Sequence, residues 1–261
     1  MPYSRQTREP TEWDAFHAEL DAWDNLDQVA TFWWRDDDAT QITPALEQLL
    51  DCAGETPLSL AVIPRDATPE LARALDARPH ATVLQHGYAH INHAPENEKK
   101  SEFGDHRPTD SMRRELQAGF KRVSDLFGAR FLPIFVPPWN RVTDDLLPLL
   151  PGIGFRSYSS YGPATQIAAA PKNASQKGLT QINTHADIVN WRHGRGFLGE
   201  AAVLDLLTTH LTQRRRGVVD DQPTGLLTHH ADHDDACWEF IEKLLGVIQN
   251  HPATAWWTPT L

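Results

Sequence analysis

The sequence is poor in cysteine and has no long apolar run. Cys52 and Cys237 are the only cysteines in 261 residues, which excludes a framework of disulfides. Each lies in a segment with a helical pattern, where a buried and unreactive thiol is the ordinary interpretation. No run of about eighteen apolar residues occurs, and the segment "MPYSRQTREPTEWDAF" lacks the basic region and apolar core of a secretion signal. We therefore expect a cytoplasmic protein with no membrane contact and no cysteine nucleophile.

Positive charge is also scarce. The chain has 24 lysines and arginines against 35 aspartates and glutamates, which gives a formal net charge of -11. This acidic balance argues against a nucleic-acid partner and favours small or neutral ones. Apolar residues make up 40% of the chain, and a chain of 261 residues can bury a large core as a single unit. We expect one domain over residues 1–261, while the composition does not indicate an oligomeric state.

Short apolar runs alternate with helical patterns, which predicts repeated strand and helix units. The expected strands, at most eight, are residues 29–35, 57–63, 81–85, 131–136, 155–161, 179–184, 225–229 and 254–258. The expected helices are residues 12–26, 44–53, 69–78, 111–127, 143–150, 200–215 and 235–249. Strands joined by helices form a largely parallel sheet, either open or closed into a barrel. No GxGxxG or GxxxxGK[ST] motif follows any strand, which favours the barrel.

Clusters of acidic residues, histidine and tryptophan follow five of the expected strands. They are "DDDA" (36–39), "HGYAHINH" (86–93), "PPWNR" (137–141), "HADIVNW" (185–191) and "HHADHD" (229–234). In an α/β barrel the carboxyl ends of the strands form one face, where catalytic groups from different strands converge. We therefore expect these clusters to meet at one rim, with the polar segment 94–110 as a lip over it.

Two histidines four positions apart, His86 and His90, are suited to hold one ion. Together with a carboxylate from residues 36–38 they would leave coordination positions open for water and substrate, as in catalytic metal sites. His93 is a further candidate ligand. Three adjacent carboxylates repel one another unless a dication lies among them. One aspartate would then bind the ion while its neighbour acts as a general base, and a histidine from residues 229–234 could act as a general acid.

The order of these motifs resembles that of the polysaccharide deacetylase (NodB homology) family. The motifs are Asp-Asp after the first strand, His-x-x-x-His after the third, Pro-Pro-Trp after the fourth, then Asp-x-x-x-Trp and Leu-x-His, over residues 31 to 230. The resemblance implies an α/β fold, a distorted (β/α)7-type barrel, here with an N-terminal helical extension. It also implies metal-dependent removal of acetyl groups from amino sugars or ester-substituted sugars.

The resemblance assigns roles to the first two clusters. "RDDDA" is similar to the family's Asp-Asp-Gly element, so Asp37 would be the base and Asp38 a metal ligand. Ala39 stands where glycine is usual, so a register with Asp36 as the base and Asp37 as the ligand stays open. "HGYAH" (86–90) is similar to the family's His-Ser/Thr-x-x-His element and implies that both its histidines are ligands of one divalent ion, for which zinc is expected.

"VPPWN" (136–140) is similar to the family's Arg-Pro-Pro-Tyr-Gly element. It implies that Pro138 and Trp139 line the substrate site and that the Trp139 amide holds the oxyanion. Val136 replaces the arginine that orients the base in the family. Arg35 and Arg141 are the candidates to compensate for it.

"DIVNW" (187–191) and "LTH" (227–229) are similar to the family's Asp-x-x-Asp-Trp and Leu-x-His elements. They imply that Asp187 and Trp191 support the acid, although Asn190 replaces the second aspartate. Leu227 would form a wall of the acetyl pocket and His229 would be the general acid, with His230 as the competing candidate. Tryptophans at the mouth of a site can also stack on a sugar face.

The sequence thus predicts a metal hydrolase acting on an acetylated carbohydrate or a small amide. Two alternatives remain open at this stage. His185 and Asp187 with His229 or His230 could form the two-histidine, one-carboxylate site of an iron(II) oxygenase. Val136, in place of a charged family residue, also allows a catalytically silent carbohydrate-binding barrel.

Overall fold

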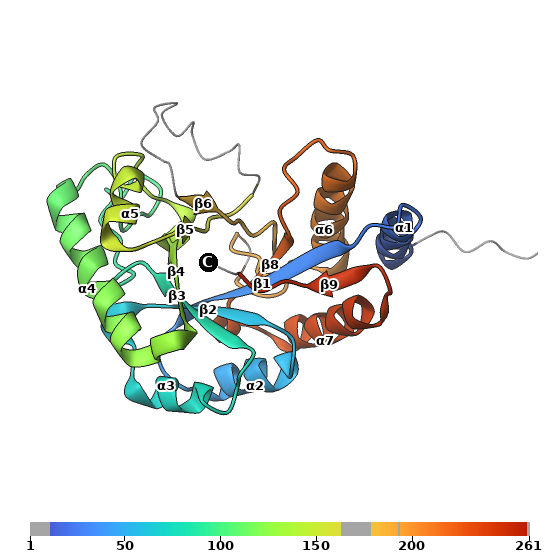
Figure 1. Cartoon of the computed structure of the whole chain (residues 1–261), viewed down its shortest axis with the longest axis horizontal. Coiled ribbons are helices and arrows are strands. Elements are labelled where there is room, and N and C mark those ends of the chain that lie inside the picture. The colour runs from blue at the N-terminus through green and yellow to red at the C-terminus, as the bar shows by residue number, and fades with distance from the viewer. Residues whose placement is uncertain (1–10, 163–178, 193, 260–261) are drawn as a thin grey trace, which may run out of the picture.

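One curled sheet of parallel strands forms the centre of the molecule (Figure 1). The computed structural model describes residues 11–162, 179–192 and 194–259. Within these residues the strands are β1 Ala30–Ala39, β2 Leu58–Val62, β3 Ala81–His86, β4 Phe131–Val136, β5 Ser157–Tyr158, β6 Thr180–Gln181, β7 Ala186–Asp187, β8 Thr224–Thr228 and β9 Thr254–Trp256. Their spatial order is β6-β5-β4-β3-β2-β1-β8-β7, and β9 pairs with the beginning of β1.

The two ends of this order, β6 and β7, are consecutive in the chain. Thr180 pairs with Ser157 of β5, and Asp187 pairs with Leu227 of β8. Between them, the His185 amide donates to the carbonyl of Gly225 at 2.7 Å. A single extended stretch, residues 180–187, therefore links the two edges of the sheet, and the expected distorted (β/α)7-type barrel is confirmed.

Seven helices in the described residues surround the sheet (Figure 1). They are α1 Glu12–Asp24, α2 Pro44–Ala53, α3 Pro69–Leu75, α4 Thr109–Phe127, α5 Leu150–Ile153, α6 Glu200–Arg215 and α7 Asp235–Asn250. Side-chain oxygens of Thr11, Thr43, Thr68 and Asp234 cap α1, α2, α3 and α7 by accepting a backbone N–H of the first turn. None of these helices combines the length and the apolar character needed to cross a membrane.

The expected N-terminal helix is present as α1, which packs on α6. Arg215 of α6 donates two hydrogen bonds to the buried carboxylate of Glu19 in α1, at 2.7 and 2.8 Å. The prediction of a helix over residues 143–150 is wrong. A short 3-10 turn, Leu147–Leu149, precedes the four-residue α5. Pro148 and Pro151 have no backbone N–H to donate, so a regular helix cannot run through this segment.

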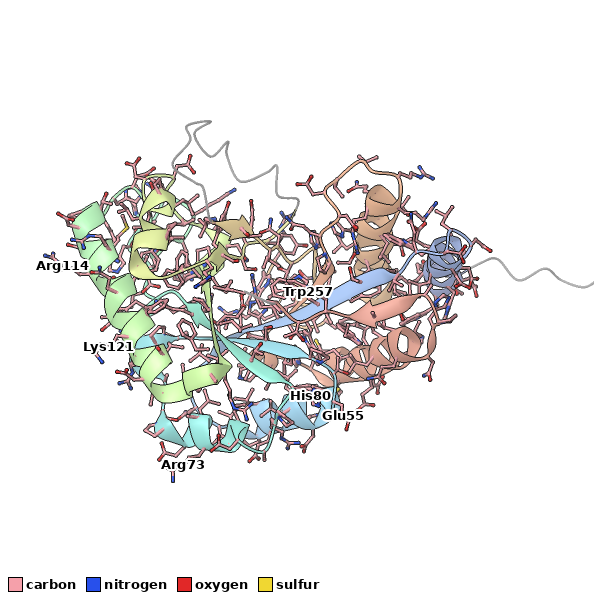
Figure 2. All side chains as sticks on the ribbon, in the orientation of Figure 1. Glu55, Arg73, His80, Arg114, Lys121 and Trp257 are labelled. Carbon is pink, nitrogen blue, oxygen red and sulfur yellow. The ribbon has the colours of Figure 1, made fainter. Side chains whose placement is uncertain are left out.

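Alternate residues of β1 face opposite sides of the sheet. Phe32 and Trp34 belong to the main core beneath the helices, whereas Trp33 belongs to a second, smaller cluster with Leu84 and Ile134. Trp257 packs against this inner cluster, and its side chain lies near the centre of the barrel in Figure 2. The same alternation, continued along β1, decides which acidic residues point into the barrel.

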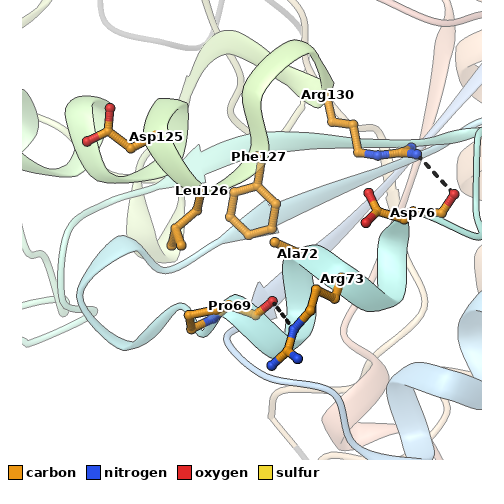
Figure 3. A pocket seen from close by; sticks show the side chains of 8 residues that line it. All are labelled: Pro69, Ala72, Arg73, Asp76, Asp125, Leu126, Phe127 and Arg130. Carbon is orange, nitrogen blue, oxygen red and sulfur yellow. Dashed lines mark hydrogen bonds between the residues drawn. The ribbon is translucent and has the colours of Figure 1, made fainter.

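A groove on the outside of the barrel separates α3 from the end of α4 (Figure 3). Its lining residues are Pro69, Ala72, Arg73, Asp76, Asp125, Leu126, Phe127 and Arg130. The Arg130 side chain donates to the Asp76 carbonyl at 3.5 Å. None of the residues with an expected functional role lines this groove.

Two buried histidines stack behind the sheet. The ring centroids of His185 and His210 are 3.4 Å apart, with an angle of 19° between the planes. The His210 Nδ1 atom lies 2.9 Å from the Thr224 hydroxyl, and His185 Nδ1 accepts the Gly225 amide at 2.9 Å. Burial and the nearby charge of Arg214 lower the pKa of His210 to about 3, and burial, His210 and Arg214 lower that of His185 to about 2. Both rings are therefore neutral in the folded protein at mildly acidic pH.

This stacked pair should make the fold less stable in mild acid. Below pH 6.5 the unfolded chain protonates both histidines while the folded chain does not, so the free energy of unfolding falls as the pH falls. Between pH 7 and pH 5 each histidine should lower it by about 2 kcal/mol. We expect urea unfolding of a His210→Gln variant to show a loss between these pH values about 2 kcal/mol smaller than in the unmodified protein. Equal losses would contradict the assignment.

Candidate metal and active site

Asp38, His86 and His90 converge at the carboxyl ends of β1 and β3. The Asp38 Oδ1 atom lies 3.1 Å from His86 Nε2 and 3.3 Å from His90 Nε2. The three potential ligand atoms all lie within 4.8 Å of one another. In the part of the chain that the structure describes, no other group of three or more His, Cys, Asp or Glu side chains has this geometry.

Local backbone geometry places each of these side chains. The pairing of β1 with β2 shifts register between Asp36 and Ala39, and Asp38 has a φ of 74° in this irregular stretch. His86 is the last residue of β3. The chain then turns through Gly87, with a φ of 56°, and reaches His90, with a φ of 54°. The turn brings the second imidazole back to 5.1 Å from the first, measured between ring centroids.

The donor set fits a divalent cation. His86 Nδ1 lies 3.1 Å from the Val136 carbonyl, which accepts its proton and leaves Nε2 directed at Asp38. The Asp38 Oδ1 atom is buried and has no hydrogen-bond partner. A buried carboxylate oxygen facing two imidazole nitrogens is the arrangement that a cation satisfies. Two nitrogens and one oxygen are suited to zinc and to other divalent transition metals.

The three side chains also tune one another's protonation. Burial alone would raise the pKa of Asp38, but His86 and His90 outweigh it and hold that pKa well below its usual range. Burial opposes the charged form of His86, but Asp37 and Asp38 outweigh it and raise its pKa. Burial, and then the neighbouring His86, lower the pKa of His90. A cation bound here would compete with a proton for the His86 ring, so its affinity would depend on pH.

Asp37 points to the inner side of the sheet, on the same face of β1 as Arg35. Arg35 Nη2 donates to Asp37 Oδ2 at 2.9 Å, and Arg35 Nε lies 2.8 Å from Asp37 Oδ1. The guanidinium also donates to the Ser159 hydroxyl at 2.6 Å and to Asn140 Oδ1 at 3.0 Å. Arg141, the other arginine considered for this role, is exposed and donates to the Lys100 carbonyl instead. A planar two-point contact of this kind fixes the orientation of a carboxylate.

Asp36 points to the opposite side of the same strand. Its carboxylate accepts the His230 amide at 3.0 Å and the Thr228 hydroxyl at 2.7 Å, and it lies 2.5 Å from His230 Nδ1. Burial alone would raise the pKa of Asp36, but the charges of His230 and His233 and the hydrogen bonds from His230 and Thr228 together outweigh it and lower that pKa. Asp36 and His230 are thus engaged with each other under the helices, which leaves Asp37 and His229 on the side of the candidate ligands Asp38, His86 and His90.

His229 lies between two carboxylates. Its Nε2 atom is 3.9 Å from Asp37 Oδ2, and its Nδ1 atom is 3.8 Å from Asp187 Oδ1. The Trp191 ring meets the His229 ring edge-on, with centroids 4.6 Å apart, and Trp191 Nε1 donates to Asp187 Oδ2 at 2.7 Å. Burial raises the pKa of Asp187, and His229 opposes this shift. Neither distance from His229 to a carboxylate is that of a hydrogen bond, so the imidazole lies between the Asp187 carboxylate on its Nδ1 side and the proposed base on its Nε2 side.

Comparison with solved structures places this barrel among known folds. The chain aligns with a family 4 (CE4) carbohydrate esterase from Streptomyces lividans in complex with acetate, with a TM-score of 0.54 and 13% identity over 88% of this chain and 93% of that one. It aligns with a CE4 esterase from Streptococcus mutans with a TM-score of 0.56 and 10% identity over 93% and 90% of the two chains. The fold is that of the CE4 esterases. No family model and no curated protein sequence matches the chain.

A structure described as the T48 deacetylase with substrate also aligns with this chain. It aligns with a TM-score of 0.50 and 13% identity, covering 89% of each chain. The architecture expected from the order of the motifs is thus the one that the chain adopts. At these identities the likeness concerns the fold, and the chemistry of this CE4-type barrel has to be argued from its own side chains.

Several of the remaining expected residues lie at or just after the carboxyl ends of β4, β7 and β8 in the CE4-type barrel. Pro138 is buried, and Leu227 has no exposed surface. Trp139 has a φ of 56°, and its ring centroid lies 4.3 Å from that of His90. Trp191 is 44% exposed, so part of its ring is free to meet a ligand. His93 is exposed, and it is not part of the ligand group.

The residues considered for an iron(II) site do not form one in this CE4-type barrel. His185 stacks on His210, and its Nδ1 atom accepts the Gly225 amide. Within the described ranges, neither His185 nor Asp187 belongs to a group with ligand geometry. Asn140, whose side-chain oxygen accepts a hydrogen bond from Arg35, was not among the residues expected from the sequence, because an asparagine in a loop carries no signal of such a distant contact.

Proposed function

We propose that this protein is a metal-dependent hydrolase that removes an acetyl or related acyl group from a carbohydrate amide or ester. The observation that carries the proposal is the convergence of Asp38, His86 and His90 within 4.8 Å on the barrel rim that also holds Asp37 and His229. Two similar structures are esterases by name and another is a deacetylase, which favours an acetyl group as the acyl unit.

The three ligands would hold one divalent ion, for which zinc suits the two nitrogens and one oxygen. When bound, the ion supplies Lewis-acid polarisation of the acyl oxygen and of the attacking water. Asp37 acts as the general base that accepts the proton of this water. Arg35 keeps the Asp37 carboxylate in one orientation through its two-point contact.

His229 acts as the general acid that protonates the departing nitrogen or oxygen of the sugar. Asp187 lies 3.8 Å from its Nδ1 atom, while its Nε2 atom lies on the side of Asp37. Leu227 and Pro138 supply apolar walls for the acyl methyl group. The Trp139 amide is the donor proposed for the developing oxyanion, and the exposed part of Trp191 is the surface proposed to meet the sugar ring.

The test is release of acetate from acetylated oligosaccharides by the purified protein. We expect hydrolysis that is lost after treatment with a chelator and returns when zinc is added back. His93→Ala is the matched control, because His93 is an exposed histidine of the same segment outside the ligand group. Hydrolysis that persists unchanged in the chelator-treated protein would rule out the metal mechanism, and metal retention without any hydrolysis would favour a silent binding barrel.

His229→Ala is expected to lower turnover of amide substrates by about 10²–10⁴ while zinc stays bound. The reason is that the amine of an amide substrate cannot leave without a proton, whereas the nitrophenolate of an activated ester leaves as a stable anion. The loss should therefore be much smaller with a nitrophenyl acetate than with an N-acetylated sugar. Parallel kcat measurements on the two substrates check this, and equal losses would show that His229 does not act as the acid.

A further inference from the structure

Glu102 is a buried carboxylate that none of the steps above uses. It lies in the polar segment 94–110, yet its side chain is fully shielded from solvent. Its Oε1 atom accepts the amide of Ala89 at 2.7 Å, and its Oε2 atom accepts the amide of Tyr88 at 3.1 Å. These two amides belong to the turn between His86 and His90. One carboxylate therefore accepts both hydrogen bonds from the backbone that joins two of the proposed ligands.

The turn has room for this carboxylate only because residue 87 is glycine. A Cβ atom at Gly87 would lie 2.1 Å from Glu102 Oε2 and 2.5 Å from Pro138 Cγ. Any other residue would displace the carboxylate or the proline, and it would also have to adopt the positive φ of 56° found here. Gly87 and Glu102 are therefore two halves of one local arrangement.

The backbone around Glu102 is itself fixed. Arg107 donates to the Glu102 carbonyl at 3.1 Å and forms a two-point ion pair with Glu115 of α4 at 2.8 and 2.6 Å. The next residue, Phe103, is fully buried, and its carbonyl accepts the Thr143 amide at 2.8 Å. This part of the segment expected to form a lip is thus anchored at three points and cannot follow the turn if the turn moves.

We propose that Glu102 is a positioning residue for the metal centre, which holds the turn of residues 87–89 so that both imidazoles meet Asp38. The inference rests on the metal site of the proposed function, but it concerns how that site is built. Hydrogen bonds from amides to a carboxylate are stronger than those to a neutral acceptor. Without them, the two amides would lose their partners and His90 would no longer be held over Asp38.

The first measurement is the zinc dissociation constant of the folded protein. Glu102→Ala should weaken zinc binding by about 10–100-fold, the usual effect of removing a group that orients a ligand. The zinc affinity of Glu102→Gln should lie between those of Glu102→Ala and the unmodified protein. The glutamine oxygen still accepts one backbone N–H, but its NH₂ group faces the other. Zinc affinities that are the same in Glu102→Ala and in the unmodified protein would overturn the proposal.

The second measurement needs no metal. Hydrogen exchange of the metal-free protein should show slow exchange at the Tyr88 and Ala89 amides and clearly faster exchange in Glu102→Ala. If the unmodified protein binds no zinc, the proposed function fails, and this readout still decides whether Glu102 holds the turn. Unchanged exchange at both amides would overturn the role given to Glu102.

A matched control separates positioning from general destabilisation. Glu19 is also a buried carboxylate with two hydrogen bonds, but it joins α1 to α6 away from the proposed ligands. Glu19→Ala should lower the melting temperature and leave zinc affinity unchanged. If Glu19→Ala weakens zinc binding as much as Glu102→Ala does, the effect of Glu102 is only structural and the proposal is wrong.

A double variant tests the link to Gly87. Gly87→Ala should weaken zinc binding in the unmodified background because its methyl group collides with Glu102. In a Glu102→Ala background that collision is gone, so the same substitution should have a smaller effect on zinc affinity. If Gly87→Ala weakens zinc binding by the same factor in both backgrounds, Gly87 and Glu102 do not act together, and the proposed link between them is contradicted.

Discussion

Replacing His86 by alanine is expected to abolish tight zinc binding and, with it, hydrolysis. The substitution leaves only one carboxylate and one imidazole, and it removes the ligand whose proton on Nδ1 is held by the Val136 carbonyl. Loss of an orienting group alone weakens metal binding by about 10–100-fold, so loss of the ligand itself should exceed the upper end of that range. Asp38 would also lose the hydrogen bond and the charge of His86, which help to hold its pKa low, and its partly exposed carboxylate would keep the contact with His90 at 3.3 Å.

The measurement is the zinc content of the purified variant after dialysis, together with acetate release. His93→Ala serves again as the control and should keep both. Circular dichroism establishes that the variant is folded, because His86 is buried and its removal leaves a cavity. A folded His86→Ala protein that keeps one equivalent of zinc would refute the ligand assignment and the mechanism built on it.

Asp37→Asn is expected to lower turnover by about 10²–10⁴ while zinc binding persists. Asparagine has nearly the same shape as aspartate, but its amide cannot accept a proton from water. The substitution also leaves the buried Arg35 without its counter-charge, which should cost about 3 kcal/mol of stability. Turnover should therefore be measured well below the melting temperature of the variant, with zinc content determined on the same sample.

Arg35→Lys is the informative partner of this variant. Lysine keeps the positive charge but cannot contact both Asp37 oxygens in one plane, so turnover should fall less than in Asp37→Asn. Asp36→Asn is a contrasting variant, because Asp36 faces His230 on the other side of β1. It should reduce stability more than turnover. A pattern in which Asp36→Asn stops catalysis and Asp37→Asn does not would show that the alternative register of the three aspartates is the right one.

The barrel and the meeting of distant clusters at one rim follow from features that the sequence carries locally. Apolar runs and helical patterns predicted most strands and helices to within a few residues. The alternation of side chains along β1 also decides which of the three aspartates faces the inside of the barrel. Trp33, Arg35 and Asp37 share one face if the strand continues past residue 35, and it extends to Ala39. The strand predicted over residues 29–35 stops before the three aspartates, so this alternation was not extended to them, and Ala39 in place of glycine left their register open.

Other features depend on contacts that no local pattern encodes. Whether Arg35 or Arg141 faces Asp37 depends on where two loops lie in space. The hold of Glu102 on the Tyr88 and Ala89 amides joins parts of the chain that sequence patterns treat as separate loops. The short α5 is a different case. Pro148 and Pro151 are local signals in the sequence that argue against a regular helix over residues 143–150, although a helix was predicted there.

The neighbours of β1 have a consequence for how the chain reaches its native state. β1 is the first strand in the sequence, but two of the strands that pair with it, β8 and β9, are the last two. Trp34 at its middle donates to Thr228, 194 residues further on. During synthesis, the strand that bears Asp37 and Asp38 cannot pair with β8 until the ribosome has made nearly all of the described chain. Pairings this far apart in sequence form slowly, so a nascent or truncated N-terminal half would expose an unpaired sheet edge and depend on chaperones.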